Sequence, residues 1–88
     1  MNIIWNYELE FKYEQTHYLP LGYKILSVQQ QRGKICVWVQ IDPDRDTQEV
    51  TFFIRCTGDE IKNSKSIVYL NTVQMDDGLV WHVFKEKN

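Results

Sequence analysis

The strongest constraint on this chain is a strict alternation of apolar and polar side chains near its start. Successive side chains on a β-strand point to opposite faces, so a period of two places one set on a buried face. A helix would scatter the same residues around its circumference. The alternation therefore predicts a strand over residues 3–11 whose core face carries Ile3, Trp5, Tyr7, Leu9 and Phe11.

Further segments of strand character follow at short, regular intervals along the chain. They cover residues 23–30, 34–41, 49–56, 67–75 and 79–85, with a shorter strand through Thr16 and Tyr18. Turn-forming residues separate them, including Gly33 and the pair Asp77-Gly78. No segment has a convincing 3.6-residue period. The pattern predicts an all-β fold: a small antiparallel β-sandwich or partly open barrel of about six strands, with no substantial helix.

Alternation also predicts which side chains share a face within each strand. Over residues 49–56 both faces carry apolar bulk, with Phe53 beside Arg55 on one of them, so this strand is expected to be central or covered on both sides. Over residues 67–75 the pattern places Thr72 on the face opposite Tyr69. The long polar stretch over residues 57–66 is expected to form a surface loop.

Length and charge limit the classes of protein to which the chain can belong. Its 88 residues suffice for a single domain over residues 1–88. The net charge of −2 disfavours nucleic acid as a partner, because binding to phosphate backbones needs a basic surface. No apolar run approaches the roughly 20 residues of a membrane span. The first residues carry no basic or long apolar signal region, so we expect a cytoplasmic protein without a membrane partner.

The chain offers little for metal binding. The run Asp42-Pro43-Asp44-Arg45-Asp46 has the spacing of a calcium loop, but Thr47 stands where the loop needs glycine and Phe53 where it needs glutamate. Two cysteines and two histidines, dispersed along the chain, do not make a four-ligand zinc site. We therefore expect no metal and no cofactor, and interpret residues 42–47 as a solvated loop.

Few residues of the chain indicate catalysis. Cys36 and Cys56 lie within apolar strands, where thiols are usually inert. His82 shares a mostly apolar strand face, which suits a half-buried histidine, a ligand contact or, less readily, acid–base chemistry. Thr57-Gly58 ends a strand, where backbone N–H groups can meet an anion. Trp38 is either a core residue or an aromatic platform for a nucleobase or a partner protein.

The ordered set of segments resembles a family of small proteins from bacteria and their phages whose function is unknown. The resemblance covers nearly the whole chain and rests on IIWNY (3–7), LPLGYKILSVQ (19–29), CVW (36–38), IDP (41–43), TG (57–58), YLNTVQ (69–74) and LVWHVF (79–84). Family members read Gly-Thr-Gly where this chain has Cys56-Thr57-Gly58, so no loop role transfers to Cys56. The resemblance implies an accessory gene of a phage or mobile element, and with it the host cytoplasm, but no activity.

The leading hypothesis is a non-enzymatic binding protein that acts in counter-defence. It would capture a nucleotide-derived signal or block a host defence protein. Its ligand-binding residues are expected to be Arg55 for a phosphate, Gln74 for a base edge, His82 as a donor and Trp38 for stacking, with Thr57 and Gly58 at the strand end. The alternatives are an assembly module that forms homo-oligomers, and a small hydrolase that uses His82 with an acidic partner.

Overall fold

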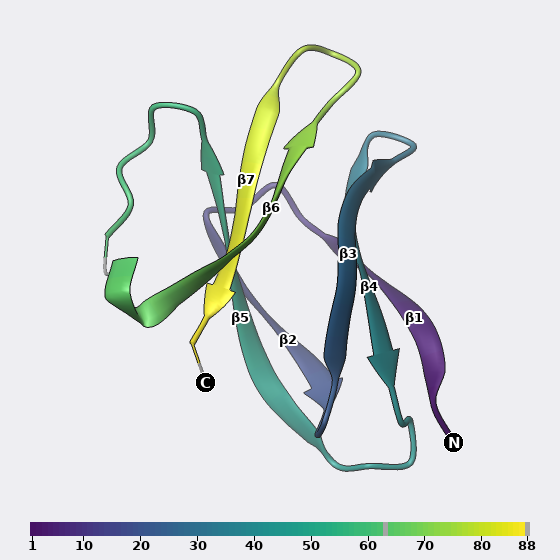
Figure 1. Cartoon of the computed structure of the whole chain (residues 1–88). Helices are drawn as coiled ribbons and strands as arrows, with labels where there is room; N and C mark the ends of the chain where they lie inside the picture. Colours follow the sequence, from purple (N-terminus) through teal and green to yellow (C-terminus); the bar gives the residue numbers. More distant parts are fainter. Residues whose placement is uncertain (63, 88) are drawn as a thin grey trace.

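Seven antiparallel strands make up the described part of the chain. A computed structural model describes residues 1–62 and 64–87, and Figure 1 shows it. The elements are β1 (Ile3–Leu9), β2 (Glu14–Pro20), β3 (Lys24–Gln31), β4 (Lys34–Ile41), β5 (Thr47–Cys56), the single 3₁₀ turn η1 (Ser64–Ser66), β6 (Ile67–Gln74) and β7 (Val80–Glu86). In this described part of the chain, no helix is long and apolar enough to cross a membrane.

The strands form two sheets that pack face to face. One sheet has three strands in the order β1-β4-β3, and the other has four in the order β2-β5-β7-β6. The sheets lie closest at β3 and β6, where Asn71 Nδ2 donates to the carbonyl of Val28 at 2.6 Å. The all-β prediction is confirmed, and the arrangement is a sandwich, since the two sheets do not close into one barrel (Figure 1).

The core lies between the sheets, as alternation requires. β4 and β5 are central strands of their sheets and turn every second residue inward, giving the fully buried Val37, Val39, Val50 and Phe52. Leu9, Leu19, Ile35 and Val83 complete this centre. Each buried aliphatic or aromatic side chain contributes about 1.5–3 kcal/mol. The two faces of β5 differ in what covers them: Phe52 lies in the core, whereas Phe53 and Arg55 lie on the outside of the four-stranded sheet.

The first strand is shorter than its alternation predicts. β1 pairs with β4 only from Ile3 to Leu9, because Ile35 opposite Leu9 is the last partner before the β3–β4 hairpin. The predicted extension to Phe11 is therefore wrong, and Phe11 lies in the connection to β2. Trp5 does have the predicted orientation, but it is 56% exposed, because β1 is an edge strand that the second sheet leaves uncovered there.

A β-bulge corrects the predicted faces of the sixth strand. The register between β6 and β7 shifts between Tyr69 and Asn71, which adds one residue to β6 at Leu70. An extra residue reverses the alternation beyond it. Thr72 therefore lies on the same outer face as Tyr69, and the two side-chain oxygens are 2.6 Å apart.

Candidate functional site

Four of the six residues predicted to bind a ligand lie together. Arg55, Thr57, Gly58 and His82 line a cavity of about 240 Å³ on the outside of the four-stranded sheet, together with Cys56, Asp59, Ile61 and Phe84; we call it the His82 hollow. Arg55 in β5 is paired directly with His82 in β7, so the strand register brings these two residues side by side. The turn after β5 then carries Thr57 over the same position.

His82 is held at both ring nitrogens. Its Nε2 lies 2.8 Å from Thr57 Oγ1, and its Nδ1 lies 3.0 Å from Thr72 Oγ1. A hydroxyl can donate or accept, so the network accommodates either neutral tautomer. A hydroxyl supplies no charge to stabilise an imidazolium ion, in contrast to the carboxylate of a catalytic triad. The arrangement therefore favours His82 as a fixed hydrogen-bonding group over His82 as an acid–base catalyst.

A compact turn fixes Thr57. The backbone N–H of Cys56 donates to Asp59 Oδ2 at 2.7 Å, and the N–H of Asp59 donates back to the carbonyl of Cys56 at 3.0 Å. Gly58 has φ +95°, a conformation that side-chain-bearing residues rarely adopt. The turn thus holds the Thr57 hydroxyl against the imidazole, and it also places the carboxylate of Asp59 in the wall of the His82 hollow.

Arg55 is the most unusual residue of this region. Although it is a cation, it is only 4% exposed. Its Nη1 donates to the carbonyls of Tyr13 and Ile54 at 2.8 and 3.0 Å, and its Cζ lies 3.2 Å from the centre of the Tyr13 ring. Within residues 1–62 and 64–87, no carboxylate pairs with Arg55, and its buried Nε has no hydrogen-bond partner. Buried charges are normally paired, so Arg55 is a cation without its usual counter-ion.

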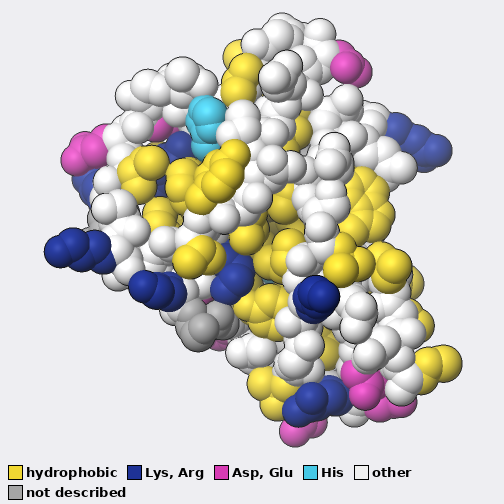
Figure 2. Space-filling model, in the orientation of Figure 1, with side chains coloured by type: hydrophobic (Ala, Val, Ile, Leu, Met, Phe, Trp, Pro, Cys, Tyr) yellow, Lys and Arg dark blue, Asp and Glu magenta, His cyan; other side chains and the backbone are white. Residues whose placement is uncertain are grey.

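A second cavity lies on the other side of Arg55. It measures about 420 Å³, and we call it the Arg55 hollow; its lining residues are Tyr13, Glu14, Phe53, Arg55, Lys62, Ser66, Ile67, Glu86 and Lys87. Three cations and two carboxylates give it a net positive lining, although the whole chain has a net charge of −2. Figure 2 shows Lys and Arg side chains gathered near the η1 side of this face, next to exposed hydrophobic side chains.

Backbone contacts between distant segments assemble the Arg55 hollow. Tyr13 comes from the connection between β1 and β2, and its hydroxyl donates to the carbonyl of Glu60 at 3.1 Å. Lys87 is held beside η1, because its backbone N–H donates to the carbonyl of Ser66 at 2.8 Å. The backbone N–H of Ile54 donates to the carbonyl of Tyr13 at 3.1 Å and extends the pairing of β2 with β5.

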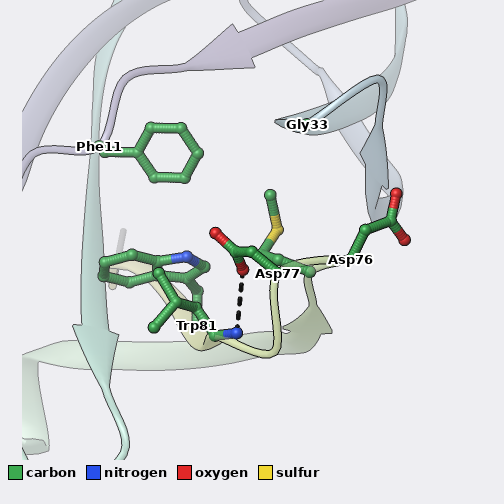
Figure 3. A pocket seen from close by; sticks show the side chains of 7 residues that line it. Phe11, Gly33, Asp76, Asp77 and Trp81 are labelled. Atoms are coloured by element: carbon green, nitrogen blue, oxygen red, sulfur yellow. Dashed lines mark hydrogen bonds between the residues drawn. The ribbon is translucent and has the colours of Figure 1, made fainter.

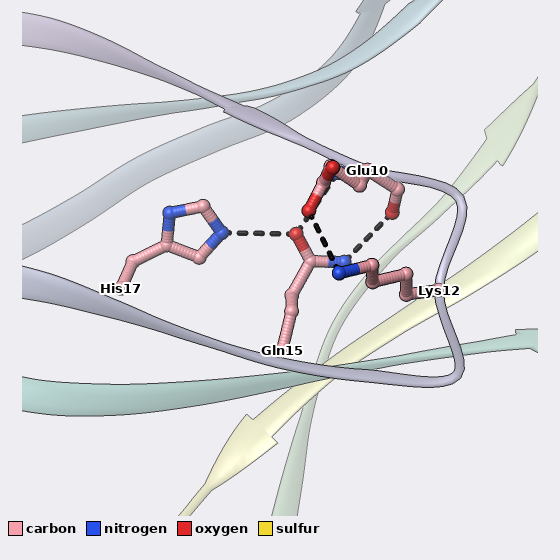
Figure 4. A network of polar contacts seen from close by, with 4 residues as sticks. All are labelled: Glu10, Lys12, Gln15 and His17. Carbon is pink, nitrogen blue, oxygen red and sulfur yellow. Dashed lines mark hydrogen bonds and ion pairs between the residues drawn. The ribbon is translucent and has the colours of Figure 1, made fainter.

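A corner of polar contacts holds the segment that carries Tyr13. The side chain of Gln15 accepts from the backbone N–H of Glu10 at 2.9 Å. It also donates to the carbonyl of Glu10 at 2.7 Å (Figure 4). Gln15 Oε1 also lies 2.9 Å from His17 Nε2, which must therefore be the donor. Burial lowers the pKa of His17, and the negative charge of Glu10 opposes that shift in part. We call residues 10–13 the β1–β2 corner.

Two predicted site residues lie elsewhere. Trp38 is on the outer face of β4, between Asn6 and Ser27 of the neighbouring strands, and thus on the sheet that does not carry Arg55. It lines neither hollow, so the structure does not bring Trp38 together with the other predicted residues, and its stacking role stays a prediction. Gln74 lies at the end of β6 opposite Val80, on the same sheet as His82, but it lines neither hollow.

Apart from Arg55, the aromatic and basic residues of the Arg55 hollow were not predicted to belong to a site. Phe53 had a usable signal, because alternation places it on the same face as Arg55. Tyr13 stands in a polar stretch that breaks the alternation, and Lys62 and Lys87 stand in a loop and in the C-terminal segment. Nothing local to these three residues indicates that the fold brings them together.

Comparison with known proteins identifies a matching family. Residues 1–88 match a family described as "Domain of unknown function (DUF7352)". No curated protein and no solved structure matches the chain.

Proposed function

The chain belongs to this family of unknown function, and from its own geometry we propose that it is a non-enzymatic binding protein for a small nucleotide-like ligand that carries a phosphate. The ligand occupies the Arg55 hollow and extends toward the His82 hollow. The observation that carries the proposal is Arg55 itself, a buried cation in the wall of both cavities with no carboxylate partner in the described residues.

The charge of Arg55 supports an anionic ligand. Arginine binds phosphate through two parallel N–H groups, and Nη1 is already used by two backbone carbonyls. Nε, by contrast, has no hydrogen-bond partner within the described chain. Lys62 and Lys87 add two exposed cations to the same cavity. A phosphate held by these three residues would supply the missing counter-ion.

Aromatic rings and size favour a nucleotide over a free ion. Tyr13 and Phe53 lie within reach of the Arg55 guanidinium, at 3.2 and 5.6 Å from Cζ to the ring centres. Aromatic faces stack nucleobases, and that stacking contributes about 1–3 kcal/mol per base. The volume of about 420 Å³ lies within the range of about 300–1,000 Å³ that is usual for ligand pockets.

Acidic groups narrow the class of ligand. Glu14 and Glu86 line the Arg55 hollow, and Asp59 lines the His82 hollow. Their charges oppose the accumulation of negative charge in either cavity. We therefore propose a ligand with a single phosphate or phosphodiester group rather than a polyphosphate, with the hydroxyl of Thr57, which His82 holds in place, contacting its polar edge.

Native mass spectrometry of protein purified without added ligand tests the proposal first, because a bound nucleotide adds several hundred daltons. Calorimetric titration with AMP, adenosine and inorganic phosphate follows. We expect AMP to bind more tightly than either fragment. Lys62→Ala with Lys87→Ala should weaken AMP binding about fivefold to tenfold, and the control Lys24→Ala, on the other sheet, should not. Failure of AMP and of a cyclic dinucleotide to bind would rule out this site.

A role in counter-defence extends the proposal and rests on the resemblance to phage-borne proteins. The ligand would then be a nucleotide-derived alarm signal of the host, which the protein removes by binding. Expression in cells that carry a nucleotide-signalling defence should restore phage plating, and the Lys62→Ala, Lys87→Ala variant should not. Equal rescue by both proteins would instead indicate that the chain blocks a host protein.

A second candidate function is self-assembly, and the edge strand β1 is the observation that favours it. Ile4 and Trp5 are 62% and 56% exposed on this strand, which pairs on one side only. Unprotected edges and exposed apolar residues promote association. Light scattering coupled to gel filtration distinguishes the functions, because assembly predicts an oligomer that Trp5→Lys dissociates and ligand capture alone predicts no such dependence.

A further inference from the structure

A third cavity lies at one end of the sandwich, where the β1–β2 corner meets the β3–β4 and β6–β7 hairpins. It has a volume of about 370 Å³, and we call it the end pocket; its lining residues are Phe11, Gly33, Met75, Asp76, Asp77, Leu79 and Trp81. Figure 3 shows the rings of Phe11 and Trp81 on one side and the acidic hairpin across from them. The end pocket shares no lining residue with the Arg55 or His82 hollows.

Apolar groups form most of the wall. The rings of Phe11 and Trp81 are tilted at 44° with centres 5.5 Å apart, and they leave part of their faces toward the cavity (Figure 3). Phe11 is 49% exposed and Leu79 is 51% exposed, so the fold leaves this apolar surface uncovered. The indole Nε1 of Trp81 is buried without a hydrogen-bond acceptor in the described residues.

Two carboxylates stand over this apolar wall. Asp77 Oδ1 accepts from the backbone N–H of Leu79 at 3.0 Å, and Asp76 Oδ1 receives a long contact of 3.5 Å from Gln30 Nε2. Each carboxylate keeps its second oxygen for another partner. No Lys, Arg or His among the described residues lines the end pocket, and neither aspartate belongs to an ion pair there.

We propose that the end pocket binds an organic cation, an ammonium or guanidinium group on an apolar stem. Carboxylates form their strongest hydrogen bonds with such groups, and aromatic faces attract cations. Met75 and Leu79 give an apolar stem a surface on which to bury. An anion would be repelled by Asp76 and Asp77.

The cation can come from a free amine or from a basic residue of a partner protein, and the test separates the two. The probes are n-pentylammonium, N-acetyl-lysine methylamide, neutral 1-pentanol and anionic pentanoate. The readout is the indole N–H signal of Trp81 in ¹H–¹⁵N NMR spectra, which a Trp81→Phe variant assigns. Tighter binding of the lysine derivative than of pentylammonium points to a partner protein, and the reverse order points to a free amine.

The expected result is binding of both cations at least about fivefold tighter than of 1-pentanol, with no binding of pentanoate. Asp76→Asn with Asp77→Asn should remove that preference and leave the fold intact, because asparagine Oδ1 can still accept from Leu79 N–H. Asp44→Asn, in the exposed loop after β4, is the matched control and should change nothing. Equal affinity for amine and alcohol, or no shift with either cation, overturns the proposal.

Discussion

The Arg55 hollow and the end pocket are both lined by aromatic rings and charged side chains, but the lining of the first is net positive and that of the second is negative. In the Arg55 hollow the central cation is buried in a strand and fixed by two backbone carbonyls. In the end pocket the carboxylates stand on a hairpin turn, and asparagine could replace their contacts. We therefore expect the cation of the Arg55 hollow to contribute to stability as well as to the proposed binding, and expect the charge of the end pocket to be removable without loss of stability.

The two regions also share a structural element. The β1–β2 corner supplies Phe11 to the end pocket and Tyr13 to the Arg55 hollow. Gln15 braces this corner through both backbone polar groups of Glu10. Two sites with no common lining residue thus depend on one buried side chain, which links their geometry even though their charges act separately.

The largest effect is expected for Arg55→Ala. The variant loses the hydrogen bonds to Tyr13 and Ile54 and the stack under the Tyr13 ring. Removal of a charged donor from two carbonyls should lower the free energy of unfolding by about 2 kcal/mol, and loss of the phosphate contact should weaken AMP binding more than about tenfold. Urea denaturation and calorimetry measure the two effects. A fully stable variant would show that Arg55 does not brace the corner.

Gln15→Ala should disturb both regions at once. Gln15 is 8% exposed, and its removal leaves the Glu10 N–H and carbonyl without their side-chain partner. Each hydrogen bond contributes about 0.5–1.5 kcal/mol, so the loss of these two should lower the free energy of unfolding by about 1–3 kcal/mol. Binding of AMP and of pentylammonium should weaken together, by about twofold to fivefold each. Weakening of only one would show that Phe11 and Tyr13 are positioned independently.

Lys62→Ala with Lys87→Ala should separate binding from stability within the Arg55 hollow. Both lysines are exposed, so unfolding should change by less than about 0.5 kcal/mol. AMP binding should weaken and lose part of its salt dependence, while pentylammonium binding at the end pocket stays the same. A loss of stability as large as that expected for Arg55→Ala would contradict the prediction that the two lysines act in binding and not in stability.

Sequence reasoning reached the fold because alternation and turn chemistry agree along most of the chain. The strand over residues 34–41 was predicted at its observed bounds, Lys34–Ile41, since turns mark both ends. The end of β1 was missed because alternation is a property of side chains, whereas a strand ends where its pairing partner ends. The bulge at Leu70 was missed for a similar reason, because only the pairing with β7 reveals the extra residue.

The candidate site was predictable only in part, for a physical reason. Arg55, Thr57 and Gly58 are neighbours in sequence, and the pairing of β5 with β7 brings His82 beside them. Alternation fixes which residues share a face of one strand, but it does not say which sheet that strand joins. Trp38 was therefore grouped with residues that lie on the other sheet, and Tyr13, Lys62 and Lys87 were missed because long-range contacts bring them together.

The smallest effect is expected from pH, acting through His17 at the base of the β1–β2 corner. Burial lowers the pKa of His17 from its ordinary 6.5, with Glu10 opposing, so the folded state favours the neutral ring. At a pH between the lowered pKa of His17 in the folded state and its ordinary pKa in the unfolded chain, the unfolded chain binds more protons. The free energy of unfolding therefore rises with pH in this range. The contribution of His17 is thus complete above pH 6.5 and is lost as the pH falls through the lowered folded value.

Urea denaturation of the wild type and of His17→Asn from pH 7.5 down to pH 5 measures the contribution of His17 to the pH dependence of stability. The variant should show the flatter dependence of stability on pH, because it has no ring to protonate at the corner. Binding of AMP and of pentylammonium should respond to the same titration in parallel, since Gln15 connects His17 to the segment that carries both Phe11 and Tyr13. If stability depended on pH equally in the wild type and in His17→Asn, His17 would not couple the Arg55 hollow to the end pocket.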